Sequence, residues 1–595
     1  MVSPTSPGSV ALACLRLFVD ELVRCGVAAV CMSPGSRSTP LVLAVARDGR
    51  LPLHVHLDER SAAYAAVGII RATGRPAAVV CTSGTAVANW HPAVVEASQS
   101  QLPLLLLSAD RPAFLRGTGA NQTIDQLAIF GGAARWFVDA AVPEERNDEA
   151  RYWRSLGCSV VARATGPVPG PVHVNFPLQE PLVPDEDDDA VELGEEATGR
   201  PGGRPWGAQG TPRVEPDQAA VVRVRHLLAA APRGVVVAGG LTRRAPAVER
   251  LADALDWPLL AEPISGLRTG PRTLGAGVLV VGDQSFTDVH RPDLVLQVGA
   301  APTARSMQRL VAAADTHVVI AEPGHASDPG RTAAETLEGD VEAISSTLAS
   351  TLASTLASTL ASTLASGRGQ DNGAPAGWAD AWAAADSAAS DAVAETIRRF
   401  GDELFEGAVA RDVAAAVPAG GLLVAGSSMP IRDLDAYMQP RHGLDVVANR
   451  GASGIDGVLS TAVGCATIRP TTVLLGDLSL LHDAGALLWN GRAPLPLTVV
   501  VVNNGGGGIF GTLSAAALPE LDRLFVTPHR VELAALAAAA GARHDVCRTV
   551  GELRAVLAAG SASGLRVVEV VVDPLRTAHQ QAAVRAAVAQ ALARD

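Results

Sequence analysis

VVVVNNGGGGIF, residues Val499–Phe510, joins four valines to two asparagines and four glycines. Four consecutive β-branched residues fit a strand that is covered on both faces, as in a parallel sheet. Four consecutive glycines weaken any regular element, so a ligand close to this backbone is the first explanation for them. The stretch predicts a buried parallel strand that ends at a binding site.

A second apolar strand is expected at Val473–Leu475, closed by Gly476 and Asp477. Asn504 follows Asp477 by 27 positions, which is enough for one strand, helix and strand unit. Ligands of open parallel sheets lie beyond the carboxyl ends of the strands, where a carboxylate and an amide oxygen suit Mg²⁺. Nearby glycines let the backbone approach a phosphate. The alternative is a helix-capping Asp477 followed by a flexible loop, but the spacing favours a metal-bound diphosphate.

Apolar strands alternate with Ala-rich helical segments, which predicts an α/β fold of three domains with parallel sheets flanked by helices. Two segments separate these domains. The first is an acidic, Gly/Pro-rich stretch, and the second contains five tandem TLAS copies, Thr347–Ser366. A four-residue period drifts about 40° per copy around a helix, so we expect a tolerated insertion without chemistry. The expected parts are a first domain at 1–185, a linker at 186–215, a central domain at 216–345, a repeat-containing linker at 346–377 and a last domain at 378–595.

Composition restricts the possible functions. A net charge of −13 argues against general nucleic-acid binding. Seven cysteines without a CxxC pair predict a reducing compartment, hence a cytoplasmic protein. No apolar run of about 18 residues is free of charge, so no membrane span is expected. Near the N-terminus, Arg16, Asp20 and Glu21 favour an amphipathic helix over a signal sequence.

The Gly476-Asp477 and Asn503-Asn504 pair resembles the diphosphate-binding motif of thiamine diphosphate-dependent enzymes. The resemblance implies thiamine diphosphate with Mg²⁺, or Mn²⁺ in its place, held by Asp477, the Asn504 side chain and the Gly506 carbonyl. It also implies that Glu59, in HLDERSAAY, protonates the aminopyrimidine ring of the cofactor. From position alone, Glu59 is equally well a carboxylate that stabilises a helix N-terminus.

In this family the catalytic glutamate of one subunit meets the cofactor that is held by another. The first block, with TSGTAVAN and LPLLLLSADRP, resembles the pyrimidine-binding domain of these enzymes. The resemblance therefore implies a homo-oligomer, a dimer at least or a tetramer.

Further motifs resemble a narrower family, the 2-succinyl-5-enolpyruvyl-6-hydroxy-3-cyclohexene-1-carboxylate synthases of menaquinone biosynthesis. They include SPGSRSTPL, GTGANQTIDQ, GPVHVNFPLQEPL, SSMPIRDLD, NRGASGIDG and GDLSLLHD. The resemblance covers the expected first and last domains and is weak in the expected central domain. It implies decarboxylation of 2-oxoglutarate and addition of a succinyl-semialdehyde carbanion equivalent to isochorismate. An acetohydroxyacid synthase-like enzyme, another 2-oxo acid decarboxylase and a non-catalytic relative stay open as alternatives.

Both implied substrates carry two carboxylates, which guanidinium groups bind well. The resemblance also implies that Ile455 is an apolar wedge that bends the cofactor. The substrate residues it implies are Ser36, Arg37, Arg111, Arg305, Ser428, Arg432 and Arg450. The cofactor residues it implies are Asn121, Gln122, Ile455, Gly476, Asp477, Leu478, Ser479, Asn504, Gly506, Ile509 and Phe510.

Overall fold

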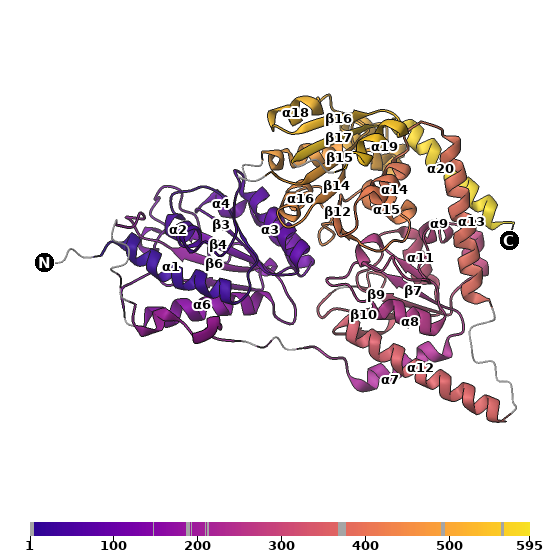
Figure 1. Cartoon of the computed structure of the whole chain (residues 1–595), viewed down its shortest axis with the longest axis horizontal. Helices are drawn as coiled ribbons and strands as arrows, with labels where there is room; N and C mark the ends of the chain where they lie inside the picture. The colour runs from indigo at the N-terminus through magenta and orange to yellow at the C-terminus, as the bar shows by residue number, and fades with distance from the viewer. Residues whose placement is uncertain are drawn as a thin grey trace.

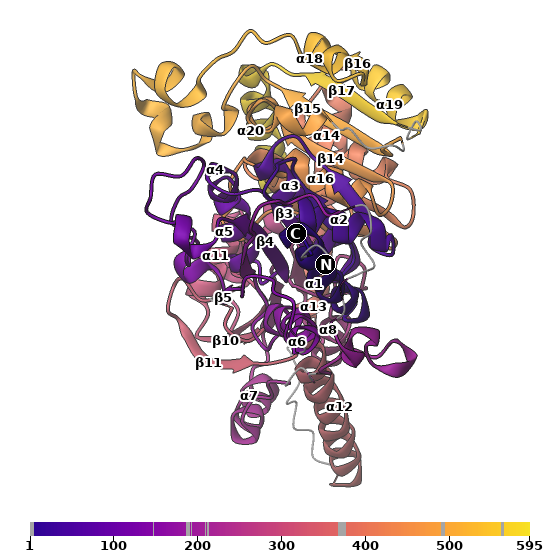
Figure 2. The same ribbon diagram turned by 90° about the vertical axis from the view of Figure 1, so that its left-hand side faces the viewer.

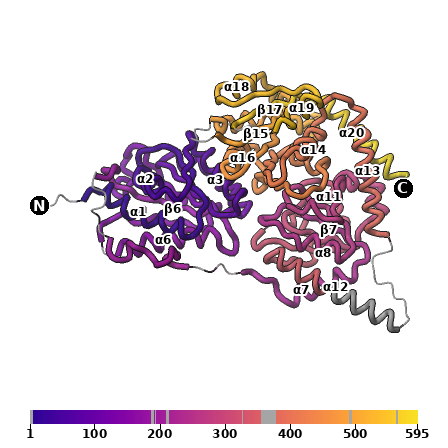
Figure 3. The backbone as a smooth tube through the Cα atoms, viewed as in Figure 1, coloured from indigo at the N-terminus to yellow at the C-terminus, as the bar shows by residue number. Residues whose placement is uncertain are grey.

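The computed structural model of the chain contains three parallel β-sheets with helices packed on them, so the predicted α/β class is confirmed (Figure 1). The backbone passes from the first sheet to the central sheet and then to the third (Figure 3). The structure describes residues 5–594 except 147, 186–190, 192, 209, 211, 212, 326, 367–376, 489–493 and 561–563, and for residues 354–366 only the backbone.

The first domain has the strand order β2-β1-β3-β4-β6-β5. Its helices form one hydrophobic core on each face of the sheet. The strands are β1 (Val30–Met32), β2 (Leu53–Val55), β3 (Ala77–Cys81), β4 (Leu104–Asp110), β5 (Trp136–Asp139) and β6 (Val172–Pro177). The helices are α1 (Pro7–Arg24), α2 (Thr39–Asp48), α3 (Glu59–Thr73), α4 (Thr85–Ala88), α5 (His91–Gln99) and α6 (Glu149–Ala164).

The central domain has the strand order β11-β10-β9-β7-β8. The strands are β7 (Gly234–Ala238), β8 (Leu259–Ala261), β9 (Leu294–Val298), β10 (Thr316–Ala321) and β11 (Ala333–Glu338). The helices are α7 (Gln218–Ala230), α8 (Ala247–Leu255), α9 (Gly277–Val280), α10 (Gln284–Val289), α11 (Arg305–Ala313) and α12 (Val341–Ser366).

The third domain has the strand order β13-β12-β14-β15-β17-β16. The strands are β12 (Gly421–Ala425), β13 (Leu444–Val447), β14 (Thr471–Gly476), β15 (Leu497–Asn503), β16 (Arg543–Cys547) and β17 (Leu565–Val571). The helices are α13 (Trp378–Arg399), α14 (Glu406–Ala416), α15 (Met429–Tyr437), α16 (Val458–Ala466), α17 (Asp477–His482), α18 (Leu533–Ala539), α19 (Val550–Ala558) and α20 (Pro574–Leu592).

The first copies of the TLAS repeat pack into the central domain, whereas the sequence predicted a linker. Helix α12 starts before the repeat, and Leu348 and Leu352 from the first two copies are buried in the core of the central domain. The drift of a four-residue period is small over two copies, so two successive leucines still face the same side of a helix. The start of the repeat is therefore structural.

The first and third domains contact each other through α3 and α16, which lie side by side in both views (Figures 1 and 2). A Cβ built on Gly464 of α16 would lie 1.9 Å from the Ala65 carbonyl oxygen of α3. Tyr64 donates a hydrogen bond of 2.5 Å to Asp456, just before α16. The two helices pack with their backbones in contact. No helix among the described residues combines the length and apolar character that crossing a membrane requires.

Candidate active site

The predicted pair of polar residues lies at two adjacent strand ends. Strands β14 and β15 are hydrogen-bonded neighbours, with Gly476 opposite Val502, so Asp477 and Asn504 follow at the same edge of the sheet. Asp477 accepts hydrogen bonds from the Leu478 amide at 2.7 Å and from the Gly506 amide at 2.9 Å. The Asp477 carboxylate is thereby fixed at the carboxyl end of the sheet.

The Asn504 side chain presents one polar atom without a partner. Its Nδ2 donates to Glu406 Oε1 at 3.0 Å, whereas its Oδ1 is buried and has no hydrogen-bond partner among the described residues. A buried oxygen without a hydrogen-bond partner costs free energy unless a ligand binds to it. An oxygen ligand beside the Asp477 carboxylate fits Mg²⁺, so these residues suit the implied metal.

Three of the four glycines after Asn504, Gly506, Gly507 and Gly508, are in close contact with other parts of the chain. A Cβ on Gly506 would lie 2.5 Å from the Val526 carbonyl oxygen, and one on Gly508 would lie 2.6 Å from Asn504 Nδ2. The Gly507 amide also donates to Val526 O at 2.7 Å. This backbone therefore packs tightly against Val526 and the Asn504 amide, which the ligand argument from sequence did not anticipate.

His529 is a residue of this site that the sequence argument missed. Its Nδ1 accepts from the Val531 amide at 3.2 Å, so its Nε2 carries the proton and donates to Asp477 Oδ2 at 3.2 Å. Burial raises the pKa of the Asp477 carboxyl, while the Leu478 amide and His529 act in the opposite direction. A histidine 52 positions away in sequence gave no local signal.

A cavity of about 450 Å³ opens at this sheet edge, and its lining, as far as the chain is described, belongs to the third domain. It includes two acidic residues that the sequence argument missed, Glu406 and Asp433. Burial raises the pKa of both carboxyls, and the neighbouring charge of Glu406 adds to the shift at Asp433. The predicted residues that line it are Ser428, Arg432, Arg450, Ile455, Gly476, Asp477, Leu478, Ser479, Asn504, Gly506, Ile509 and Phe510.

The predicted residues of the first domain gather in a separate place. Arg111 donates to the Gln122 carbonyl at 2.8 Å and to the Ser83 hydroxyl. Burial and the charge of Arg37 lower the pKa of Arg111. Ser36, Asn121 and Gln122 are exposed, and none of these predicted residues lines the cavity of the same chain.

Glu59 is the first residue of α3 and is half-buried. The capping of this helix is done by its neighbour Asp58, whose side chain accepts from the amides of Arg60 and Ser61. Glu59 does not line the cavity of its own chain. Its catalytic assignment stays a prediction, because a position at a helix N-terminus fits both interpretations given above.

The central domain contributes to a group of charged residues near the cavity. Arg450 donates to Thr303 Oγ1 at 3.1 Å, and the Thr303 amide donates to Glu262 Oε1 at 2.6 Å. Burial raises the pKa of Glu262, while the charges of Arg450 and Arg432 act in the opposite direction. Arg305 is exposed, and its charge contributes to lowering the pKa of Arg432.

Two of the predicted residues have an unusual backbone conformation. Ser428 has a φ of 76° and Gln122 a φ of 56°, both in the left-handed region that non-glycine residues seldom adopt. Such conformations cluster at functional sites, where surrounding contacts maintain them. Both positions therefore agree with a role in ligand binding.

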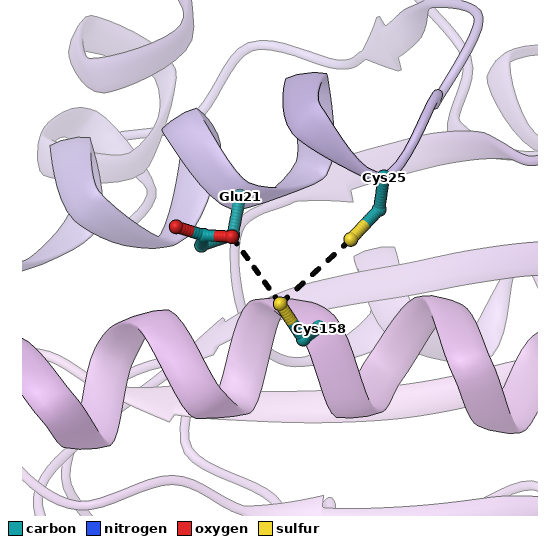
Figure 4. A group of neighbouring side chains, drawn as sticks. All are labelled: Glu21, Cys25 and Cys158. Carbon is teal, nitrogen blue, oxygen red and sulfur yellow. Dashed lines mark hydrogen bonds between the residues drawn. The ribbon is translucent and has the colours of Figure 1, made fainter. Parts of the chain in front are cut away.

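A second polar cluster lies away from the cavity, between α1 and α6 (Figure 4). Cys25 Sγ lies 3.8 Å from Cys158 Sγ, and Cys158 donates to Glu21 Oε2 at 3.2 Å. Arg154 contacts the other oxygen of Glu21 at 2.5 Å. The guanidinium already neutralises this carboxylate, so the cluster is poorly suited to a cation.

Comparison with known proteins agrees with this geometry. Residues 14–129 match the thiamine pyrophosphate enzyme N-terminal TPP binding domain, and residues 429–570 match the C-terminal TPP binding domain. The chain is similar to 2-succinyl-5-enolpyruvyl-6-hydroxy-3-cyclohexene-1-carboxylate synthases. That of Thermobifida fusca is 43% identical over 97% of this chain and 98% of the relative. That of Rubrobacter xylanophilus is 42% identical over 94% and 95%.

The predicted thiamine diphosphate chemistry and the narrower resemblance are thus confirmed. The enzyme from Geobacillus thermodenitrificans is 37% identical over 93% of this chain and 92% of the relative, so the similarity extends through the central domain as well. The chain belongs to the 2-succinyl-5-enolpyruvyl-6-hydroxy-3-cyclohexene-1-carboxylate synthase family of thiamine diphosphate-dependent enzymes.

Proposed function

We propose that this chain decarboxylates 2-oxoglutarate and adds the resulting four-carbon unit to isochorismate, forming the product for which its relatives are named. The observation that carries the proposal is the composition of the cavity. The Asp477 carboxylate and the unsatisfied oxygen of Asn504 line the same space as Arg432 and Arg450. One group suits a metal-bound diphosphate and the other suits carboxylate substrates.

In this proposal Asp477, Asn504 and the Gly506 carbonyl hold Mg²⁺, or Mn²⁺ in its place. When bound, thiamine diphosphate supplies the electron-accepting carbon that decarboxylation of a 2-oxo acid requires. Ile455 lines the cavity and would supply an apolar contact to the cofactor, and the Ser479 hydroxyl fixes the Ile455 backbone through a hydrogen bond of 2.9 Å to its carbonyl. The remaining cofactor contacts are Gly476, Leu478, Ile509 and Phe510.

We further propose that the first domain of a second subunit completes the site. Every described residue that lines the cavity belongs to the third domain, while Glu59, Asn121 and Gln122 lie in the first domain outside that lining. Two copies related by a twofold axis would bring each first domain to the cavity of the other. Glu59 would then donate a proton to the pyrimidine ring of the bound cofactor. A site shared in this way needs at least a dimer, and a tetramer is the alternative.

Substrate binding is assigned to guanidinium and hydroxyl groups from all three domains. Arg432, Arg450 and Ser428 come from the third domain and Arg305 from the central domain. Ser36, Arg37 and Arg111 come from the first domain of the second copy. The cytoplasm is the proposed location, because the cysteines are free thiols. The domain boundaries near residues 185, 215, 345 and 377 stay predictions.

The test is the reaction itself, with both substrates, thiamine diphosphate and Mg²⁺ present. The expected outcome is release of CO₂ from 2-oxoglutarate together with a product whose mass equals the joined fragments. Pyruvate in place of 2-oxoglutarate separates this reaction from that of an acetohydroxyacid synthase-like enzyme. Faster CO₂ release from pyruvate would contradict the proposal.

A further inference from the structure

Glu96, on α5 of the first domain, reaches across to the third domain of the same chain. Its Oε1 accepts a hydrogen bond from the Gly451 amide at 3.0 Å, and its Oε2 accepts one from the Ala452 amide at 2.7 Å. Two successive backbone amides form a small anion-binding site, which the carboxylate fills. The contact joins positions that are more than 350 residues apart in sequence.

The Glu96 carboxylate is itself held firmly. It is 1% exposed, and its Oε1 also accepts from Arg71 Nη2 at 2.9 Å and from Ser100 Oγ at 2.7 Å. A buried carboxylate is tolerated when donors and an opposite charge surround it. Because helix α5 and Arg71 fix the carboxylate, the backbone that it binds is fixed as well.

The segment bound by Glu96 carries residues of the cavity. Arg450 directly precedes the two amides, Ser453 and Ile455 follow them, and all three line the cavity. Thr303 of the central domain holds the Arg450 side chain from another direction. Two other domains therefore bind this segment. The first domain binds its backbone through Glu96, and the central domain binds the Arg450 side chain through Thr303.

Gly451 gives an independent indication that the contact is close. A Cβ at this position would lie 2.7 Å from both the Glu96 carbonyl oxygen and Ser100 Oγ. Only glycine lets the segment approach the end of α5 to this distance. The approach can therefore be disturbed from either side, through the carboxylate or through Gly451.

We propose that Glu96 is a positioning residue, which aims the Arg450 guanidinium and the Ile455 side chain into the cavity by fixing the Gly451 and Ala452 amides. The inference rests on the proposed function, in which Arg450 binds a substrate carboxylate. The effect of Glu96 then acts through Arg450, so loss of Glu96 weakens substrate binding more than turnover.

The first test is Glu96→Gln in the full-length enzyme. The amide group replaces one acceptor oxygen and faces an N–H donor, so one of the two contacts is lost. The expected result is a KM for 2-oxoglutarate raised about tenfold, with kcat changed by less than about threefold. Hydrogen exchange of the peptide that contains residues 450–455 should become faster. Glu145→Gln, the same chemical change at an exposed position of the first domain, is the matched control and should change neither quantity.

Gly451→Ala keeps the carboxylate and should reproduce both changes. A double-mutant cycle that combines Glu96→Gln with Arg450→Met distinguishes the positioning role of Glu96 from the substrate-binding role of Arg450. If Glu96 acts through Arg450, the double variant has the same KM as Arg450→Met alone. If Arg450→Met raises KM but Glu96→Gln alters neither KM nor hydrogen exchange, the positioning role is wrong. If Arg450→Met leaves KM unchanged, the substrate role of Arg450 is wrong, and faster exchange in Glu96→Gln still establishes the backbone contact.

Discussion

Gly68 of α3 and Thr461 of α16 are in backbone contact, since a Cβ on Gly68 would lie 2.0 Å from the Thr461 carbonyl oxygen. A second glycine, Gly464, makes the reciprocal contact with Ala65. The interface between the first and third domains therefore depends on the absence of two methyl groups. The hydrogen bonds from the Gly451 and Ala452 amides to Glu96 join the same two domains.

Gly68→Ala should separate these helices and lower the free energy of unfolding by about 1–3 kcal/mol, because the added carbon overlaps a backbone carbonyl. Chemical denaturation measures the change. Gly132→Ala is the control, since a Cβ there meets nothing within 4 Å. Equal stability of the two variants would contradict the close packing.

Asp477→Ala should abolish metal-dependent binding of thiamine diphosphate, because the proposed Mg²⁺ site loses its charged protein ligand. Titration calorimetry with and without Mg²⁺ measures the binding. Circular dichroism should remain unchanged. An unaltered affinity in the presence of Mg²⁺ would remove Asp477 from the metal site.

Glu406→Ala should weaken Mg²⁺ binding about tenfold, since Asn504 loses the acceptor that fixes its amide orientation. The binding of Mn²⁺, followed by electron paramagnetic resonance, reports this without any turnover. Glu406→Gln keeps an acceptor oxygen and serves as the matched variant, with affinity close to that of the unaltered enzyme. Equal affinity of the Ala and Gln variants would exclude an orienting role.

Glu59→Gln should lose about 10²–10⁴ in rate, because the amide cannot deliver a proton. If the site is shared between subunits, mixing this inactive variant with inactive Asp477→Ala restores activity. Random reassortment into dimers gives about a quarter of the original activity, since half of the dimers have one intact site. No recovery in demonstrated heterodimers would place both residues in one chain, or leave Glu59 as a helix-terminal carboxylate.

Leu348→Ala should lower the free energy of unfolding by about 2–5 kcal/mol, because it empties a buried position in the central core. Thr347→Ala is the control at an exposed neighbour. The midpoint of urea denaturation measures both. The first copies of the repeat are therefore expected to contribute to stability, unlike a tolerated insertion. Equal midpoints for the two variants would show that these copies are dispensable.

The sequence predicted those parts of the site that follow from local pattern. Asp477 and Asn504 each end an apolar strand, and the length between them fits a crossover unit, so their proximity could be inferred. Glu406 and Glu96 could not be inferred in this way. Glu406 begins a helix and Glu96 lies within one, where ordinary surface carboxylates are also common, and their partners lie 98 and 355 positions away. Such contacts depend on how helices and domains pack, which periodicity does not encode.

The repeat in α12 was predicted only in part for a related reason. Its composition indicated low complexity, but the burial of Leu348 and Leu352 depends on the neighbouring helix α8 in the same core. The sequence gives the spacing of leucines along α12 and not the surface against which they pack.

The tandem copies in α12 also determine how the chain would respond to a change in their number. Because all five copies are identical, the chain that follows Ser346 would still begin TLASTL whichever unit was lost. The two leucines that reach the central core therefore keep their place, and variation in copy number is directed to the far end of the helix.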